Sequence, residues 1–320
     1  MVKLLAFDMN APVESHFIEV EGTRLHWAET GRAGRVPLVL LHGLNDSHLT
    51  WKHLSRRFAS DRRVLMPDLA GHGRSERPDA SYELSWHAHL IAEWMKAIEV
   101  ERADVLGHSF GGGVAQMLLL EVRERIRRLV LLSSGGLCNG VAWALRLASL
   151  PLVVERFGQP FMAAGTRLAL RGLRERTEIA ELCALNAEPG TARAFARSVR
   201  DVVNWRGQRR SFARRAHELP SLPPIAVYWG TRDRLIPYAD AKLFACLLEN
   251  VVFEVFEDCD HYLHHEEPEA VARAIRDFLD APEVAPARLR MATPEPARAR
   301  VTWFVSGSRR SRAAPRSLRR

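Results

Sequence analysis

Residues 104–113 restrict the fold of this chain more than any other stretch. An apolar run breaks at Gly107, offers one hydroxyl at Ser109 and passes through three glycines, starting at Gly111, into the helix-like segment 114–120. This order predicts a strand, a sharp turn and a helix. In a Gly-x-Ser-x-Gly turn the serine backbone is cramped, so the flanking positions must lack side chains for the strand and the helix to approach each other.

The same turn places Ser109 at the edge of the predicted sheet. The backbone N–H of Phe110 and the N-terminus of the following helix then point to where negative charge would develop during attack on a carbonyl. The pattern alone also fits a glycine-rich connection with a buried serine. The strand signal before it and the helix signal after it favour a nucleophilic serine.

Apolar runs alternate with helix-like segments along most of the chain. The expected strands are a hairpin at 16–20 and 24–29, followed by runs at 37–41, 63–67, 104–108, 128–132, 224–229 and 251–256. This alternation predicts an α/β protein with a mostly parallel sheet, right-handed crossovers and helices on both faces. Residues 136–218 lack a buried-strand signal and predict an all-helical insertion.

The chain therefore divides into a core domain formed by 14–135 and 219–280, the insertion at 136–218, and a tail at 281–320. The tail has ten arginines against Glu283 and Glu295, which accounts for the whole net charge of +8. Its Ala, Pro, Arg and Ser content predicts disorder. Because no nucleic-acid motif accompanies the basic residues, we expect no nucleic-acid partner.

Several classes of protein are disfavoured. No stretch of eighteen uncharged apolar residues occurs, so we expect no membrane span. Asp8 interrupts the N-terminus before an apolar signal region develops, which favours a cytoplasmic protein. Cys138, Cys183, Cys246 and Cys259 lack metal-ligand spacing and are expected to be buried free thiols. The sequence offers no metal site and no nucleotide fingerprint, and we expect no cofactor.

A serine needs a base, and the base needs an orienting group. Among thirteen histidines, His261 follows the strand that ends at Phe256 and precedes the last predicted helix, which puts it on the rim expected for Ser109. His264 and His265 lie further towards that helix. A solvated loop histidine remains the alternative for His261.

The orienting acid should come from another strand end. Asp233 directly follows the strand at 224–229. A role in a turn or as a helix cap is the alternative for this aspartate. Asp258 and Asp260 are too near His261 in sequence to reach around its ring easily.

The chain order of Ser109, Asp233 and His261 resembles that of α/β-hydrolases. The resemblance covers roughly residues 14–280. Five motifs carry it: His42-Gly43, Asp68-Leu69-Ala70-Gly71-His72-Gly73-Arg74-Ser75, Gly107-His108-Ser109-Phe110-Gly111-Gly112, Trp229-Gly230-x-x-Asp233, and His261-x-x-His264-x-Glu266-Glu267-Pro268. It implies the α/β-hydrolase fold, in which the insertion at 136–218 is a cap that closes over the serine.

The resemblance also implies roles for individual residues. Ser109 would be the nucleophile, His261 the general base and then acid, and Asp233 its orienting partner. The backbone N–H groups of Leu44 and Phe110 would form the oxyanion hole.

One position departs from the family pattern. Members commonly have glycine just before the catalytic histidine, where this chain has Asp260. A carboxylate there is expected either to raise the pKa of the imidazole or to alter the loop.

A serine at the turn indicates acyl transfer, because the haloalkane dehalogenases and epoxide hydrolases of this family use aspartate there. The Gly-His-Ser-Phe-Gly turn is esterase-like, whereas C–C hydrolases usually carry asparagine before the nucleophile. We therefore expect a carboxylesterase acting on a small-molecule ester with a small or medium acyl group. The alternatives are a C–C hydrolase of the meta-cleavage type, a lactonase and, outside enzymes, a receptor of the same fold with slow turnover.

Four aromatic residues of the insertion are candidates to line the substrate pocket: Trp143, Phe157, Phe161 and Trp205. Core packing is the default expectation for each of them. The arginines of the insertion could select an anionic substrate, but a solvated helix face explains them more simply.

Overall fold

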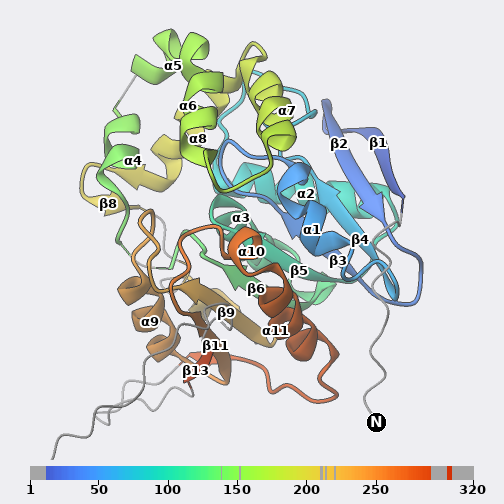
Figure 1. Cartoon of the computed structure of the whole chain (residues 1–320). Helices are drawn as coiled ribbons and strands as arrows, with labels where there is room; N and C mark the ends of the chain where they lie inside the picture. Colours follow the sequence, from blue (N-terminus) through green and yellow to red (C-terminus); the bar gives the residue numbers. More distant parts are fainter. Residues whose placement is uncertain are drawn as a thin grey trace, which may run out of the picture.

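The computed structural model describes residues 12–137, 139–150, 153–209, 212, 215–219, 221–289 and 301–304. Its centre is a nine-stranded sheet in the order β1-β2-β4-β3-β5-β6-β9-β11-β13 (Figure 1). The strands are β1 (Val13–Val20), β2 (Thr23–Thr30), β3 (Arg35–Leu41), β4 (Arg62–Pro67), β5 (Ala103–His108), β6 (Ile126–Leu132), β9 (Ile225–Gly230), β11 (Val251–Phe256) and β13 (Val301–Phe304). Among the described strands of this sheet, β1–β2 and β2–β4 pair antiparallel and the other neighbours pair parallel. The predicted α/β-hydrolase fold is confirmed.

Helices cover both faces of the sheet. One face packs against α2 (Leu84–Ala97), α3 (Phe110–Glu121) and α9 (Tyr238–Leu247), and the other against α1 (Lys52–Ser55) and α11 (Pro268–Asp280). Strand β3 shows why its sequence is continuously apolar: Val39 and Leu41 enter the first core, whereas Leu38 and Leu40 enter the second. Alternate side chains of a strand point to opposite faces, so a sheet covered on both sides buries all of them.

Shorter elements complete the core. They are the 3₁₀ helices η1 (His48–Trp51) and η2 (Arg123–Arg125), the helix α10 (Leu263–Glu266), and the small pair β10 (Leu248–Glu249) and β12 (Arg288–Leu289). The 3₁₀ helix η5 (Ala216–Glu218), at the end of the insertion that precedes β9, packs on the first core through Ala216. The segment from Trp51 to Phe58 forms the end of η1, the single turn of α1 and turns.

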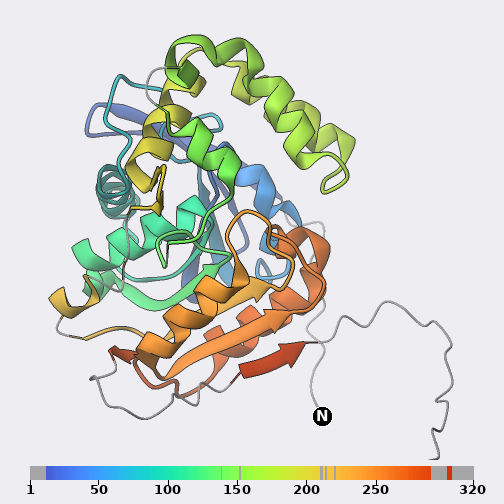
Figure 2. The same cartoon turned by 90° about the vertical axis from the view of Figure 1, so that its left-hand side faces the viewer.

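The insertion between β6 and β9, called the cap below, lies over one end of the sheet (Figures 1 and 2). It contains α4 (Trp143–Ala148), α5 (Val153–Phe157), η3 (Gln159–Phe161), α6 (Met162–Leu170), α7 (Arg176–Ala187), α8 (Thr191–Val202) and a hairpin of β7 (Val203–Asn204) and β8 (Gly207–Gln208). The cap is therefore helical apart from this hairpin. Two further apolar clusters hold the cap together, and both also contact the core domain, one through Leu49 and Tyr262 and the other through Leu44.

The expectation that the tail at 281–320 is disordered is wrong for the described tail residues that form strands. Strand β12 pairs with β10, and β13 adds a parallel edge strand beside β11. The β-branched and aromatic sequence of 301–304 suits an extended edge. Residues 290–300 and 305–320 of the tail lie outside the described residues.

The expectations of buried free cysteines and of no membrane span can be compared with the described residues. Cys183 and Cys259 are buried and free, Cys246 is free and partly buried, and Cys138 lies outside the described residues. No described helix is long and apolar enough to cross a bilayer.

Candidate active site

Ser109 occupies the turn between β5 and α3 in a conformation that side chains avoid. Its φ is 52° and its ψ is −116°. The neighbouring glycines have no room for a side chain: a Cβ on Gly111 would lie 2.2 Å from the carbonyl oxygen of Leu41, and one on Gly107 2.4 Å from that of Gly111. The close contact between strand and helix therefore requires glycine at both positions, as the sequence predicts.

Asp233 and His261 are in direct contact. Nδ1 of His261 lies 2.9 Å from Oδ2 of Asp233, and both side chains are buried. The second oxygen, Oδ1, accepts the backbone N–H groups of Leu235 at 2.9 Å and Ile236 at 2.8 Å. The loop after β9 thus fixes the carboxylate, which in turn holds the imidazole with its proton on Nδ1.

Ser109 and His261 share the wall of one cavity of about 600 Å³. Leu44 and Phe110, the two residues expected to supply the oxyanion hole, also line it. The structure therefore brings the predicted residues together, with Asp233 behind His261. Volume and shape are those of a small-molecule site.

The cavity is lined mainly by apolar side chains, many of them from the cap. Among its described lining residues the polar side chains are Asn45, Ser109, Thr166, Gln208, His261 and Tyr262, and no Arg, Lys, Asp or Glu is present. The cap arginines thus do not line the pocket. The expectation of solvated arginines is wrong for Arg174, which is buried, whereas the other described arginines of the cap are exposed or partly exposed.

The four aromatic residues of the cap are all exposed, so the default expectation of core packing is wrong for each of them. Phe157 and Phe161 line the cavity, whereas Trp143 and Trp205 do not. The expectation of core packing fails for Trp143 and Phe157 because the helices that carry them, α4 and α5, contain no fully buried residue.

The loop that carries Leu44 is tied to the cap by a set of hydrogen bonds that sequence reasoning missed. Asn45 has a φ of 58°, and its side chain donates to the hydroxyl of Thr166 on α6 at 2.9 Å. Asn186 on α7 donates from Nδ2 to the backbone oxygen of Asn45 at 2.9 Å and also reaches Thr166. Cap side chains therefore hold the backbone next to Leu44.

A buried ion pair strengthens this connection. Both Arg174 Nη atoms contact the carboxylate of Asp46, and Nη2 also donates to the Thr50 hydroxyl at 2.6 Å. Burial alone would raise the pKa of Asp46, but the charge and hydrogen bonds of Arg174 lower it to about 2. The aspartate is thus a permanent anion at ordinary pH.

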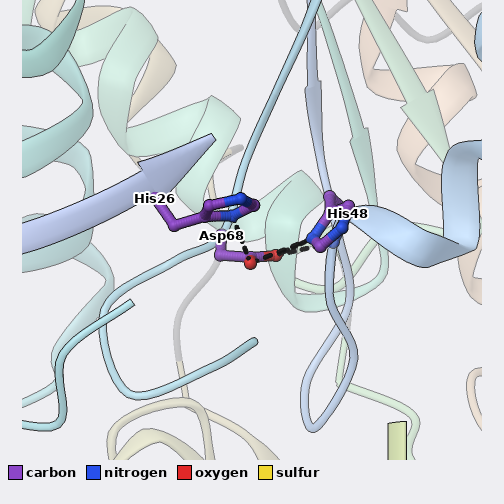
Figure 3. Close-up of side chains that lie close together, drawn as sticks. All are labelled: His26, His48 and Asp68. Carbon is purple, nitrogen blue, oxygen red and sulfur yellow. Dashed lines mark hydrogen bonds and ion pairs between the residues drawn. The ribbon is translucent and has the colours of Figure 1, made fainter. Parts of the chain in front are cut away.

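A second buried carboxylate, Asp68, holds the other side of the same loop (Figure 3). Its Oδ2 lies 2.8 Å from Nδ1 of His26 on β2, and both oxygens lie 3.0 Å from Nδ1 of His48 on η1. It also accepts the backbone N–H groups of His48 at 2.6 Å and Arg74 at 2.9 Å. The three side chains could reach one metal ion, but these donors already satisfy the carboxylate without one.

The histidine before the nucleophile contacts the loop of the proposed base. His108 Nε2 lies 3.0 Å from the backbone oxygen of His261. Burial lowers the pKa of His108 well below its ordinary value, so the ring is neutral. No sequence signal for this long-range contact existed.

The rivals named from the sequence have other partners. Nε2 of His264 and of His265 each lies 3.0 Å from the Thr50 hydroxyl. Oδ1 of Asp260 accepts the backbone N–H groups of Arg234 at 3.0 Å and of His261 at 2.8 Å. Asp260 therefore joins the loop after β9 to the loop that carries His261.

Residues 36–268 match a family model described as the alpha/beta hydrolase fold. The chain belongs to this family. Among α/β-hydrolase relatives, a 2-hydroxymuconate semialdehyde hydrolase of Pseudomonas putida is 32% identical over 85% of this chain and 97% of the relative. An uncharacterised Mycobacterium tuberculosis protein is 29% identical over 86% of this chain and 84% of its own length. The crystal structure of wild-type Cfl2 from Burkholderia cenocepacia superposes with a TM-score of 0.73, at 23% identity, over 85% of this chain and 97% of that one.

Proposed function

We propose that this α/β-hydrolase cleaves carboxylic esters with small to medium acyl groups through an acyl-enzyme on Ser109. His261 acts as base and then acid, and Asp233 orients it. The observation that carries the proposal is the 2.9 Å contact between His261 and Asp233 beside a cavity that Ser109 also lines. A nucleophile, a base and an orienting acid from three strand ends form the arrangement used for acyl transfer.

In the first half-reaction the hydroxyl oxygen of Ser109 attacks the ester carbonyl carbon while Nε2 of His261 takes the hydroxyl proton. The oxyanion accepts hydrogen bonds from the N–H groups of Leu44 and Phe110. The tetrahedral intermediate then expels the alcohol, which leaves with the proton from His261. Asp233 stabilises the imidazolium that forms between these two transfers.

In the second half-reaction a water molecule attacks the acyl-enzyme. His261 takes a proton from the water and returns it to the oxygen of Ser109 as the carboxylic acid leaves. The enzyme is then restored without any other reactant.

The lining of the cavity supports an uncharged acyl group. The relative from Pseudomonas putida suggests a second candidate, C–C hydrolysis of a muconate semialdehyde. Such a substrate carries a carboxylate, which would need a cationic or strongly donating partner once buried. The described lining residues include no Arg or Lys, so we favour the neutral ester over the C–C substrate.

The test is steady-state hydrolysis of a panel of p-nitrophenyl esters, lactones and ring-cleavage diketones by wild type and Ser109→Ala. We expect continuous release of p-nitrophenol by wild type, falling by at least about 10⁴-fold in the variant. Turnover of diketones alone would instead establish the C–C hydrolase. One equivalent of p-nitrophenol without further turnover would favour a receptor.

A further inference from the structure

Five large apolar side chains of the cap are exposed and do not line the cavity. Their exposed fractions are 73% for Trp143, 77% for Leu168 and 67% for Trp205, and Leu147 and Leu150 are also exposed. We call these five residues the cap-edge patch. Extensive exposed apolar surface on a soluble protein usually binds something.

Helical spacing places part of the patch on one face of the α4 region. Trp143, Leu147 and Leu150 recur at intervals of four and three residues, which is one side of a helix. A different side chain of α4, Leu145, packs against the cluster of Val199 and Val203 and lines the cavity. Packing inside the cap therefore does not account for the exposed face.

The patch borders the mouth of the cavity. Val153 and Phe157 on α5 and Phe161 at the end of η3 line the cavity and are nevertheless 61%, 64% and 70% exposed, so they mark its opening. Leu168 lies on α6, the helix that directly follows Phe161. The hairpin that carries Trp205 packs beside α4 through Val203 (Figure 1).

The segment that carries four of the five patch residues has more arginines than acids. Residues 139–174 contain five arginines and a single acid, Glu155. Glu155 is already paired with Arg197 and Arg200 of α8. The exposed side chains of three patch-flanking arginines have no carboxylate partner among the described residues: Arg156, Arg167 and Arg171.

We propose that the cap-edge patch docks this protein on an anionic lipid surface, and that the ester substrate enters the cavity from that surface. Exposed Trp and Leu with arginines around them are the composition of segments that lie in a membrane interface, where acidic headgroups attract the arginines. The second half of the proposal rests on the proposed esterase function; the docking does not.

A second copy of the chain fits this surface less well. In a two-fold dimer the same surface meets itself. The unpaired arginines of the two copies would then face one another, and the partner would cover the mouth of the cavity. A lipid headgroup layer supplies the opposite charge and leaves the mouth facing the source of acyl chains.

The docking is tested with inactive full-length Ser109→Ala protein and sedimented vesicles of phosphatidylcholine with or without phosphatidylglycerol. We expect binding to the vesicles that contain phosphatidylglycerol and weaker binding at high salt. Adding Trp143→Gln, Leu168→Gln and Trp205→Gln should reduce this binding at least about tenfold. The matched control replaces exposed apolar residues outside the cap: Val13→Gln, Phe17→Gln and Leu247→Gln.

A separate variant tests the role of the arginines' positive charge. Arg156→Gln, Arg167→Gln and Arg171→Gln together should remove the preference for phosphatidylglycerol. Equal binding of the patch variant and the wild type, or no vesicle binding at all, would overturn the proposal. So would a dimer of the wild type that the patch variant converts to a monomer.

Substrate entry is tested in the active protein. Because the three patch residues do not line the cavity, the patch variant should keep the kcat/KM of wild type on a soluble p-nitrophenyl ester. Its hydrolysis of a fluorogenic acyl ester embedded in phosphatidylglycerol vesicles should fall about as much as its binding. Vesicle binding by a protein that cleaves no ester would leave the docking intact and refute the proposed function.

Discussion

Nε2 of His108 lies 3.0 Å from the backbone carbonyl oxygen of His261, and this contact links the nucleophile turn to the loop of the proposed base. A carbonyl oxygen can only accept, so the imidazole of His108 donates. The low pKa of this buried ring keeps it neutral in the ordinary pH range. The donor thus stays in place while His261 changes its own protonation during turnover.

His108→Phe tests this contact because it keeps an aromatic ring and removes the donor. We expect kcat on a p-nitrophenyl ester to fall at least about tenfold with little change in KM, since small displacements of a reacting group are costly. His108→Gln, which offers an amide donor, should retain more of the kcat than His108→Phe does. Equal kcat in both variants and wild type would show that the contact has no positioning role.

Asp233 performs two separable tasks through its two oxygens. Asp233→Asn can keep the acceptor for the N–H groups of Leu235 and Ile236 while it weakens the hold on Nδ1 of His261. We expect a loss of kcat on the order of 10³ to 10⁴ with an almost unchanged melting temperature. Asp233→Ala should lose similar activity and also stability, because the loop after β9 loses its acceptor. Thermal unfolding beside ester kinetics separates the two effects.

The backbone at Ser109 stores strain that glycine would release. At a φ of 52° and a ψ of −116° a residue with a Cβ is disfavoured, whereas glycine is not. Ser109→Gly should therefore be more stable than Ser109→Ala by about 1 kcal/mol, although both are inactive. Urea unfolding of the two variants measures the difference. A less stable glycine variant would show that the turn is relaxed.

The Asp46–Arg174 pair should make stability depend on pH in the acid range. The pKa of Asp46 is about 2 in the folded protein against an ordinary value of 3.8. Its contribution is therefore fully present above about pH 4 and is lost as the pH falls through about 2. Asp46→Asn should flatten this part of the profile of unfolding free energy. At neutral pH, Arg174→Ala should cost about 3–5 kcal/mol, because it leaves a buried charge unpaired.

Because hydrogen bonds connect the cap to the loop of Leu44, we expect a substitution in the cap to change the catalytic rate. Asn186→Ala removes the donor to the Asn45 carbonyl and should lower kcat about tenfold or more by loosening the proposed oxyanion hole. Asn204→Ala, at an exposed cap asparagine, is the matched control and should retain the wild-type kcat. A change in KM alone for Asn186→Ala would point to substrate binding instead.

The features that the sequence predicts correctly are local ones. The strands and helices of the core follow from apolar runs and their spacing, and the glycines around Ser109 report the close packing that the turn requires. Asp233 and His261 are recognisable because each directly follows a strand, and parallel strands bring their carboxyl ends to one edge.

Features that depend on distant partners escape this reasoning. The contacts of Asn45 with Thr166 and with Asn186 join residues more than 100 positions apart and have no local pattern. The sequence also does not indicate which aromatic side chains are exposed. An aromatic residue predicts burial, and only the arrangement of α4 to α6 leaves Trp143 in solvent. The strand at Val301–Phe304 needs the free edge of β11, which composition cannot reveal.

The hydrogen bonds of Thr166 and Asn186 to Asn45 also limit how a new specificity could be engineered. Exchanging the insertion for that of another relative would alter the cavity that receives the acyl chain. It would also remove the hydrogen bonds that hold the loop of Leu44, which the hydrolysis of every ester requires. A chimaera that transplants only the outward half of α4, α5 and α6, with Thr166, Arg174 and Asn186 retained, changes selectivity without that penalty.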